Sequence, residues 1–206
     1  MTDTDHLFKV ISEIQAIAQN GLAYTVNEFD KLRFLRLREL AAELMKNYSQ
    51  NSYSEITEAF SLEKGYATPK IDVRSFILRN NKLLLVKERS DGLWTLPGGW
   101  ADINESPSEA IIRETKEETG FDVSAIKILA LFDKLKHEHP HQWPHTYKCF
   151  FHCEITAGKE TENLEISEIG FFNIDQLPDL STPRVTKNQL LRLYDLTINS
   201  QQTAFD

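Results

Sequence analysis

The sequence has little that would suit a secreted, membrane-embedded or nucleic-acid-binding protein. Its 206 residues include only two cysteines, so a disulfide framework is not expected. No apolar run is long enough to span a bilayer, and Met1–Lys9 has no apolar signal-peptide core. Acidic residues outnumber basic ones by 31 to 23, whereas nucleic-acid binders usually have a basic excess. We expect a cytoplasmic globular protein with neither membrane nor nucleic-acid partners.

The two cysteines and the net charge of −8 further limit the kinds of binding site that we expect. Cys149 and Cys153 lie four residues apart in an apolar stretch, on one face of a predicted strand. Two buried free thiols are favoured over a metal site or a disulfide. If the substrate is anionic, something local must offset the acidic chain, and bound divalent cations are the obvious candidate.

The hydrophobic pattern divides the chain into two parts, 1–66 and 67–206. Helical spacing predicts three helices in the first part, with Gly21 ending the first of them. Residues 1–66 are net negative, so the basic residues of the second helix are interpreted as a solvated face and not as a DNA-binding surface. The second part alternates strands and helices, which predicts an α/β fold with helices on both faces of a sheet. Strands are expected at 71–78, 83–86, 94–96, 126–132, 147–155 and 168–172, and helices after Ser106 and at 187–197.

One short helix carries the most informative pattern. Ser106, Pro107 and Glu109 form a helix start with a capping box, and Gly120 supplies the C-terminal stop. Between them, Glu114, Glu117 and Glu118 stand at i, i+3 and i+4 and so project from one face. Such neighbours repel, and the bland alternative is a solvated acidic face. The glycine loop Pro97-Gly98-Gly99 just upstream favours a site that holds hard divalent cations beside phosphates.

The stretch 99–121 resembles the Nudix hydrolase signature. Its fixed positions are all in register, and the one departure is Thr115 where an aliphatic residue is usual. Thr115 is expected to pack and not to react. The matching residues are Gly99, Glu105, Arg113, Glu114, Glu117, Glu118, Gly120 and Phe121.

The resemblance implies a role for each of these residues. Glu114, Glu117, Glu118 and the Gly99 carbonyl would hold Mg²⁺ or Mn²⁺, while Arg113 would orient the carboxylates and Glu105 would brace the loop. The implied fold is the Nudix α/β/α sandwich with a mixed sheet, preceded by a small helical domain.

The likeness extends to Leu96–Asp102 and to an N-terminal helical part containing Ala18–Leu22, which are similar to a bacterial Nudix subgroup. That subgroup acts on nucleoside diphosphates linked to X, including CDP-choline and ADP-ribose. The resemblance also suggests a homodimer in which the N-terminal arm packs between protomers and borders the active site.

Several residues outside the signature are candidates for substrate contact. Arg74, mid-strand, could reach a phosphate or pair with a core carboxylate. Arg89 follows a strand end, where it could contact a phosphate, although most such charges are solvated. Trp94, Trp100 and Trp143 could stack on a base or a choline cation, with core packing as the alternative for Trp94 and Trp100. His137–His145 is interpreted as an irregular active-site loop and not as a zinc site. Glu160, Glu162, Glu165 and Glu168 are the candidates for a late general base, and Glu165 is preferred.

These features predict metal-assisted hydrolysis of a diphosphate bridge, giving a nucleoside monophosphate and phospho-X. The rival functions are a non-catalytic ligand sensor on the same fold, an isomerase, and a hydrolase of nucleoside triphosphates or dinucleoside polyphosphates. Sensors of this kind tend to lose the signature carboxylates and to carry a basic DNA-binding module. This chain keeps every signature carboxylate and has an acidic N-terminal part, which favours catalysis.

Overall fold

The computed structural model describes residues 3–49, 51–161, 163–199 and 202–206. The chain divides into two compact units, which are treated separately below. The helical unit contains Met1–Pro69 and His141–His145, and the sheet unit contains Lys70–Pro140 and Thr146–Asp206. The division lies close to the expected boundary at residue 66, but the sequence pattern did not predict that a later segment joins the helices.

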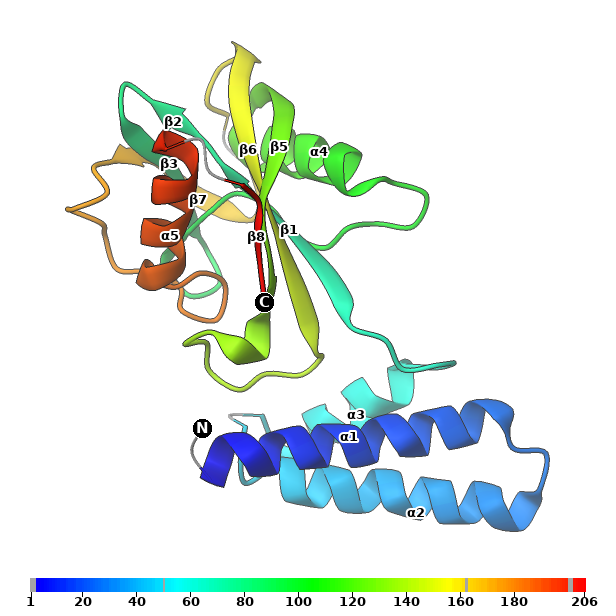
Figure 1. The fold of residues 1–206 in the computed structure, drawn as a ribbon. Coiled ribbons are helices and arrows are strands. Elements are labelled where there is room, and N and C mark those ends of the chain that lie inside the picture. Colours follow the sequence, from blue (N-terminus) through cyan, green and yellow to red (C-terminus); the bar gives the residue numbers. More distant parts are fainter. Residues whose placement is uncertain (1–2, 50, 162, 200–201) are drawn as a thin grey trace. The chain divides into compact units, whose positions relative to one another are not determined.

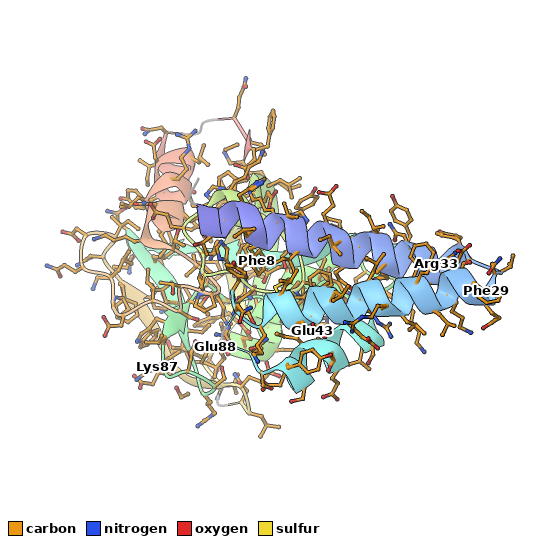
Figure 2. The ribbon with its side chains drawn as sticks, turned by 90° about the horizontal axis from the view of Figure 1, so that it is seen from below. Phe8, Phe29, Arg33, Glu43, Lys87 and Glu88 are labelled. Carbon is orange, nitrogen blue, oxygen red and sulfur yellow. The ribbon has the colours of Figure 1, made fainter. Side chains whose placement is uncertain are left out.

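The helical unit consists of α1 (Asp3–Tyr24), α2 (Glu28–Met45) and α3 (Tyr53–Leu62). Asn27 caps α2, and Ser52 forms a capping box with Glu55 at the start of α3. The first two helices lie side by side as a hairpin (Figures 1 and 2).

Gly21 does not end α1 as expected, because the helix continues to Tyr24. Its role is steric: a Cβ at position 21 would overlap the ring of Phe34 on α2. The glycine therefore allows the two helices to approach closely.

The segment His141–His145 packs within the helical unit. His141 stacks on the ring of Phe8 with centroids 4.6 Å apart, and its Nε2 lies 2.9 Å from Asp5. Trp143 meets Phe60 edge to face at 5.0 Å. The segment has no regular structure of its own and is held by these side-chain contacts.

The sheet unit contains two sheets. The first is mixed, with strand order β1-β6-β5-β8, in which β1 and β6 are parallel and β5 and β6 antiparallel. The second is antiparallel, with order β2-β3-β4 and with β7 paired to β3. The strands are β1 (Lys70–Phe76), β2 (Leu78–Arg79), β3 (Lys82–Glu88), β4 (Trp94–Thr95), β5 (Phe121–Asp133), β6 (Thr146–Gly158), β7 (Ile166–Phe172) and β8 (Ala204–Phe205).

Two helices complete the sheet unit, α4 (Pro107–Thr119) and α5 (Lys187–Ile198), and a 3₁₀ turn, η1, spans Lys134–Lys136. Alternation along the strands sends side chains to opposite faces of the mixed sheet. Val73 and Phe151 join a core with Ile111 of α4, whereas Phe76 and Phe150 join a second core with Leu193 of α5. The expected α/β fold, with a mixed sheet between helices and a helical segment before it, is confirmed (Figure 1).

Several details differ from the sequence-based expectation. The strand expected at 71–78 is divided between β1 of the mixed sheet and β2 of the antiparallel sheet. The strand expected at 126–132 begins at Phe121, immediately after the end of α4, and the short C-terminal strand β8 was not expected. The turn at Asn80-Asn81 is present, with both residues at positive φ. Among the described residues, the helices include none that is both long and apolar enough to cross a membrane.

Candidate active site

The glycine loop after β4 lies along β1. Val73 N–H donates to the Gly99 carbonyl at 2.8 Å, and Ser75 N–H donates to the Pro97 carbonyl at 2.9 Å. Gly98 has φ +134, and a Cβ there would overlap the Val73 carbonyl oxygen. Only glycine fits this close approach, and the two backbone hydrogen bonds fix the position of the loop against β1.

The helix that follows has the ends that the sequence predicts. Ser106 accepts from the Glu109 N–H, and the Glu109 carboxylate accepts from the Ser106 N–H at 2.8 Å. Gly120 ends α4 in the left-handed conformation at φ 78. Thr115 is fully buried and donates to the Ile111 carbonyl at 2.7 Å, so the departure from the signature is accommodated within the helix.

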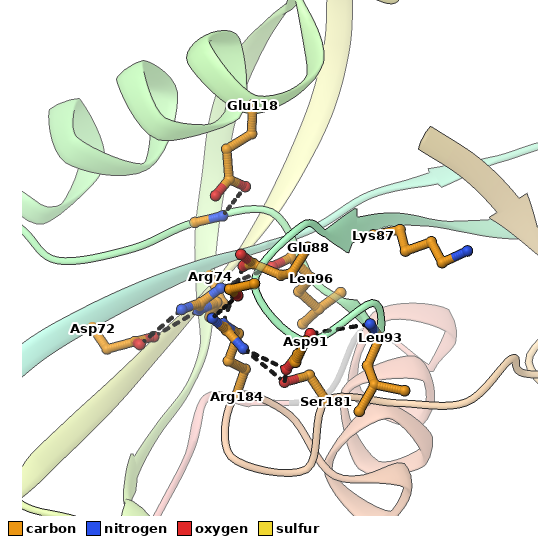
Figure 3. Close-up of polar contacts among 12 residues, drawn as sticks. Asp72, Arg74, Lys87, Glu88, Asp91, Leu93, Leu96, Glu118, Ser181 and Arg184 are labelled. Atoms are coloured by element: carbon orange, nitrogen blue, oxygen red, sulfur yellow. Dashed lines mark hydrogen bonds and ion pairs between the residues drawn. The ribbon is translucent and has the colours of Figure 1, made fainter. Parts of the chain in front are cut away.

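The three glutamates of α4 differ in exposure. Glu118 is buried, and its carboxylate accepts a hydrogen bond from Gly98 N–H at 2.8 Å (Figure 3). The carboxylate of Glu114 lies beside Gly99, so close that a Cβ at position 99 would contact it at 2.9 Å. Glu117 is exposed. Two carboxylates therefore touch the glycine loop, and the third is exposed on the same face of α4.

Arg113 connects these carboxylates to the segment just before α4. Its Nε and Nη2 atoms bind both oxygens of Glu105, at 2.7 and 2.9 Å. Its Nη1 atom donates to Glu114 at 2.8 Å and to Glu117 at 3.0 Å. This is the geometry that an orienting arginine and a bracing glutamate require.

The electrostatics of the cluster favour a cation. Burial raises the pKa of Glu118 to about 8, and the charges of Glu88 and Glu114 act in the same direction, opposed by Arg74 and the Gly98 N–H. Burial also raises the pKa of Glu114, although Arg113 opposes the shift. Negative charge is thus costly here unless a positive partner is added.

The donor set fits hard divalent cations in its chemistry. Carboxylate oxygens and a backbone carbonyl are the ligands that Mg²⁺ and Mn²⁺ prefer. The side chains are not assembled as a ready cage: the described part of the chain contains no group of three acidic, histidine or cysteine side chains at metal-binding distance. Arg113 occupies Glu114 and Glu117 in this arrangement, so those carboxylates would exchange or share that partner on binding a cation.

A second charged cluster lies on β1 and β6. Arg74 forms a bidentate pair with Asp72 at 2.8 and 3.0 Å and donates to the Leu96 carbonyl at 3.1 Å (Figure 3). Lys148, opposite Asp72 in the parallel register, donates to the same carboxylate at 3.0 Å. Of the two roles expected for Arg74, the structure shows the pair with a core carboxylate. Asp72 and Lys148 were missed, although each is a charge inside an apolar strand, the signal that had singled out Arg74.

A third group joins the β3–β4 turn to the chain before α5. Arg184 binds Glu88 at 3.0 Å and Asp91 at 2.8 Å, and Ser181 also donates to Asp91 (Figure 3). The charge of Glu88 acts on both Arg74 and Glu118. These residues border the carboxylate cluster, and no short motif in the sequence marks them.

The remaining candidates are dispersed. Trp100 follows the glycine loop and is 49% exposed, a surface available to a ligand. Arg89 and Glu165 are joined through their backbones, with Arg89 N–H donating to the Glu165 carbonyl at 2.8 Å, and both side chains are exposed. Among the other late carboxylates, Glu168 pairs with Lys87, and Glu162 lies outside the described residues.

The structure places two of the tryptophans and the histidine segment. Trp94 packs edge to face on Phe172 in the core, as the core-packing alternative for this residue expects. The Trp143 ring packs on Phe60 within the helical unit. His137 pairs with Asp206 and His139 with the Thr182 carbonyl, whereas residues 141–145 belong to the helical unit.

Comparison with known proteins places the two regions in described families. Residues 68–193 match the family described as the NUDIX domain. Residues 5–60 match the family described as "UDP-X-like, N-terminal oligomerisation domain".

Among curated relatives, the Bacillus subtilis (strain 168) protein named "Putative ADP-ribose pyrophosphatase YjhB" is 44% identical over 194 residues, covering 94% of this chain and 93% of that protein. The ADP-ribose pyrophosphatase of Methanocaldococcus jannaschii is 30% identical over 121 residues, covering 56% of this chain and 69% of the relative.

Two crystal structures are also similar. A UDP-X diphosphatase is 35% identical, with a TM-score of 0.66 and full coverage of both chains. An ADP-ribose pyrophosphatase from Streptococcus suis 89-1591 is 38% identical, with a TM-score of 0.62, covering 68% of this chain and all of the other.

Proposed function

This chain belongs to the NUDIX family and is a Nudix hydrolase, and from that premise we propose that it cleaves the diphosphate bridge of a nucleoside diphosphate linked to a second group, X. The observation that carries the proposal is the pairing of Glu114 and Glu118 with the glycine loop. Two half-buried or buried carboxylates at that loop give a cation-binding surface where a diphosphate can approach backbone without meeting a Cβ.

In the proposed mechanism, Glu114, Glu117, Glu118 and the Gly99 carbonyl hold Mg²⁺ or Mn²⁺. A bound cation would offset the charge of the diphosphate and make an attacking water more acidic. The water oxygen forms a bond to one phosphorus, and the bond from that phosphorus to the bridging oxygen breaks. A carboxylate accepts the water proton, and the bridging oxygen leaves with the second phosphate.

Different residues of the chain position the carboxylates, accept the water proton and contact the substrate. Arg113, held by Glu105, keeps Glu114 and Glu117 in place on the helix face. Gly98 N–H fixes Glu118 in a single orientation. Glu165 stays the proposed general base: it lies just before β7 on the exposed segment whose backbone pairs with Arg89, and Arg89 with Trp100 would contact the substrate.

For the substrate we propose ADP-ribose or another nucleoside diphosphate linked to X, ahead of nucleoside triphosphates and dinucleoside polyphosphates. The relative covering most of both chains is named for ADP-ribose, and the fully covered structure is a UDP-X diphosphatase. CDP-choline remains within this proposed class. The sensor alternative is disfavoured by the complete set of carboxylates on α4.

The test is a substrate panel. ADP-ribose, UDP-sugars, CDP-choline, dinucleoside polyphosphates and triphosphates are each assayed with Mg²⁺ and with Mn²⁺, and kcat/KM is compared. We expect the X-linked diphosphates to lead. Triphosphates or dinucleoside polyphosphates leading by tenfold would overturn the substrate class, and tight binding of one compound without hydrolysis of any would favour the sensor.

We also propose a homodimer formed through the helical unit. Exposed apolar side chains line α2, among them Phe29 (73%), Leu32 (63%) and Leu44 (45%), and exposed apolar patches mark sites of protein–protein contact. The match of this region to an oligomerisation domain supports the same conclusion. Light scattering of the full chain at micromolar concentration should give twice the mass of 23.8 kDa, and a monomer would contradict it.

A further inference from the structure

Lys148 is a buried cation whose charge is only partly satisfied. Its side chain is 1% exposed, and the described residues give its ammonium one hydrogen bond, to Asp72. An ammonium group has three N–H donors. Asp72 is already bound through both oxygens by Arg74, so two buried cations share one carboxylate. A buried cation that shares its counter-charge with a second cation lowers the stability of the fold unless a further anion binds to it.

Further positive charge lies close to the same point. The charges of Arg74 and Lys134 both act on Lys148, and those of Arg74 and Arg184 act on Lys134. Burial, together with these neighbours and against Asp72, lowers the pKa of Lys148 to about 8. The pKa of Lys134 is also lowered to about 8, mainly by burial. The sheet unit therefore gathers cations on the face of β1 and β6 that lies toward α5.

A neutral hydrogen-bond acceptor lies beside these cations. The Nδ1 of His139 lies 2.7 Å from the Thr182 carbonyl, which can only accept, so Nδ1 carries the proton. Nε2 is then a lone-pair acceptor, buried and without a hydrogen-bond partner among the described residues. The charges of Lys148 and Lys134 both act on this ring, and burial with those charges lowers the pKa of His139 to about 4. The imidazole is therefore neutral at physiological pH.

From this arrangement we infer that Lys148, Lys134 and His139 form a subsite for a phosphorylated sugar, distinct from the carboxylates of α4. The two ammonium groups bind phosphate oxygens, and His139 Nε2 accepts a hydrogen bond from a neighbouring sugar hydroxyl. A quaternary ammonium is disfavoured, because the cluster is itself positive. The inference rests on the proposed diphosphate hydrolysis and sharpens it: nucleotide sugars such as ADP-ribose are preferred over CDP-choline.

The experiment measures ligand binding without catalysis. The full-length protein is treated with EDTA and titrated calorimetrically with ribose 5-phosphate, inorganic phosphate and phosphocholine. Wild type is compared with Lys148→Met and with Lys82→Met, which removes an exposed lysine on β3 of the same unit. We expect the order ribose 5-phosphate, then phosphate, then phosphocholine, with at least a tenfold loss of ribose 5-phosphate affinity in Lys148→Met and no change in Lys82→Met.

A denaturation curve without ligand separates binding from structure. Asp72 keeps its bidentate partner in Lys148→Met, so the variant should be at least as stable as wild type. Unchanged ribose 5-phosphate affinity in a folded Lys148→Met, or phosphocholine binding as tight as ribose 5-phosphate, would overturn the inference. If Lys148→Met does not fold, the same titration is carried out on Lys134→Met, and unchanged ribose 5-phosphate affinity in that variant would overturn the inference. Because no metal is present, these outcomes do not depend on whether the wild type hydrolyses any diphosphate in the substrate panel.

Discussion

Two groups of buried charge in the sheet unit differ in how completely their charges are satisfied. Asp72 and Arg74 neutralise each other through two short hydrogen bonds, and the surroundings hold the pKa of Asp72 well below its usual range. Glu118 and Glu114 project from one face of α4 toward the glycine loop, and their pKa values are raised. The first group is a structural element and the second is prepared for a positive ligand. The two groups are therefore distinguished by how completely each charge is paired: the fully paired charges stabilise the fold, and the less completely paired carboxylates form the site.

Breaking the satisfied pair should have the largest effect. Asp72→Asn leaves Arg74 and Lys148 buried without a counter-charge, so the free energy of unfolding should fall by about 3–5 kcal/mol. Urea denaturation measures this. Asp122→Asn, which breaks the half-exposed pair with Lys116, is the control and should cost less than about 1 kcal/mol. Equal losses in the two variants would mean that the buried pair is not the stronger structural element.

Removing the charge of Glu118, whose carboxylate has no cationic partner among the described residues, should lower catalytic activity and leave folding intact. Glu118→Gln keeps the side-chain volume and removes the charge that holds a cation, so kcat on ADP-ribose should fall at least about 100-fold, equal to about 2.7 kcal/mol in the barrier. Glu154→Gln, on the exposed face of β6, should retain wild-type activity. Near-wild-type turnover of Glu118→Gln at saturating Mg²⁺ would show that the site is assigned to the wrong carboxylates.

The pH dependence of the free energy of unfolding should also distinguish Glu118 from the paired Asp72 and Arg74. In the metal-free protein burial raises the pKa of Glu118 from its ordinary 4.5 to about 8. The folded state therefore binds the proton more tightly, and this contribution to stability is present below pH 4.5 and lost as pH rises through 8.

With EDTA present, wild type should lose stability relative to Glu118→Gln between pH 5 and 8. Added Mg²⁺ should restore most of that difference. Denaturant titrations at three pH values measure it, and parallel curves for the two proteins would contradict the raised pKa.

Thr115, at the signature position that departs from the family pattern, should have the smallest effect. Its hydroxyl donates to the Ile111 carbonyl within α4 and contacts no site residue that the structure shows. Thr115→Val should change the free energy of unfolding by no more than about 1.5 kcal/mol and kcat by less than twofold. A large loss of kcat in a stable variant would assign this position to the chemistry.

The sequence predicted the parts of the site that are local. The cap residues, the spacing of Glu114, Glu117 and Glu118, and the glycine loop all lie within one segment, so helix periodicity and turn chemistry were sufficient. Lys148 lies next to Asp72 only because β1 and β6 pair in parallel, a register that one sequence does not reveal. For the same reason Arg184 and Glu88, almost a hundred residues apart, were not recognised as partners.

Two tertiary contacts could not be predicted from local sequence. Gly21 was taken as a helix stop because glycine often ends helices, but α1 continues past it and the glycine packs against Phe34. Trp143 packs on Phe60 because residues 141–145 join the helical unit. In both cases the partner is distant in sequence.

The central claim is that the carboxylates of α4 bind a divalent cation through Glu118, and Mn²⁺ binding tests it most directly. The signal of free hydrated Mn²⁺ in electron paramagnetic resonance is titrated against wild type, Glu118→Gln and Glu154→Gln. The account predicts saturable binding by wild type and Glu154→Gln, and at least tenfold weaker binding by Glu118→Gln. Equal Mn²⁺ affinity in all three proteins would contradict it.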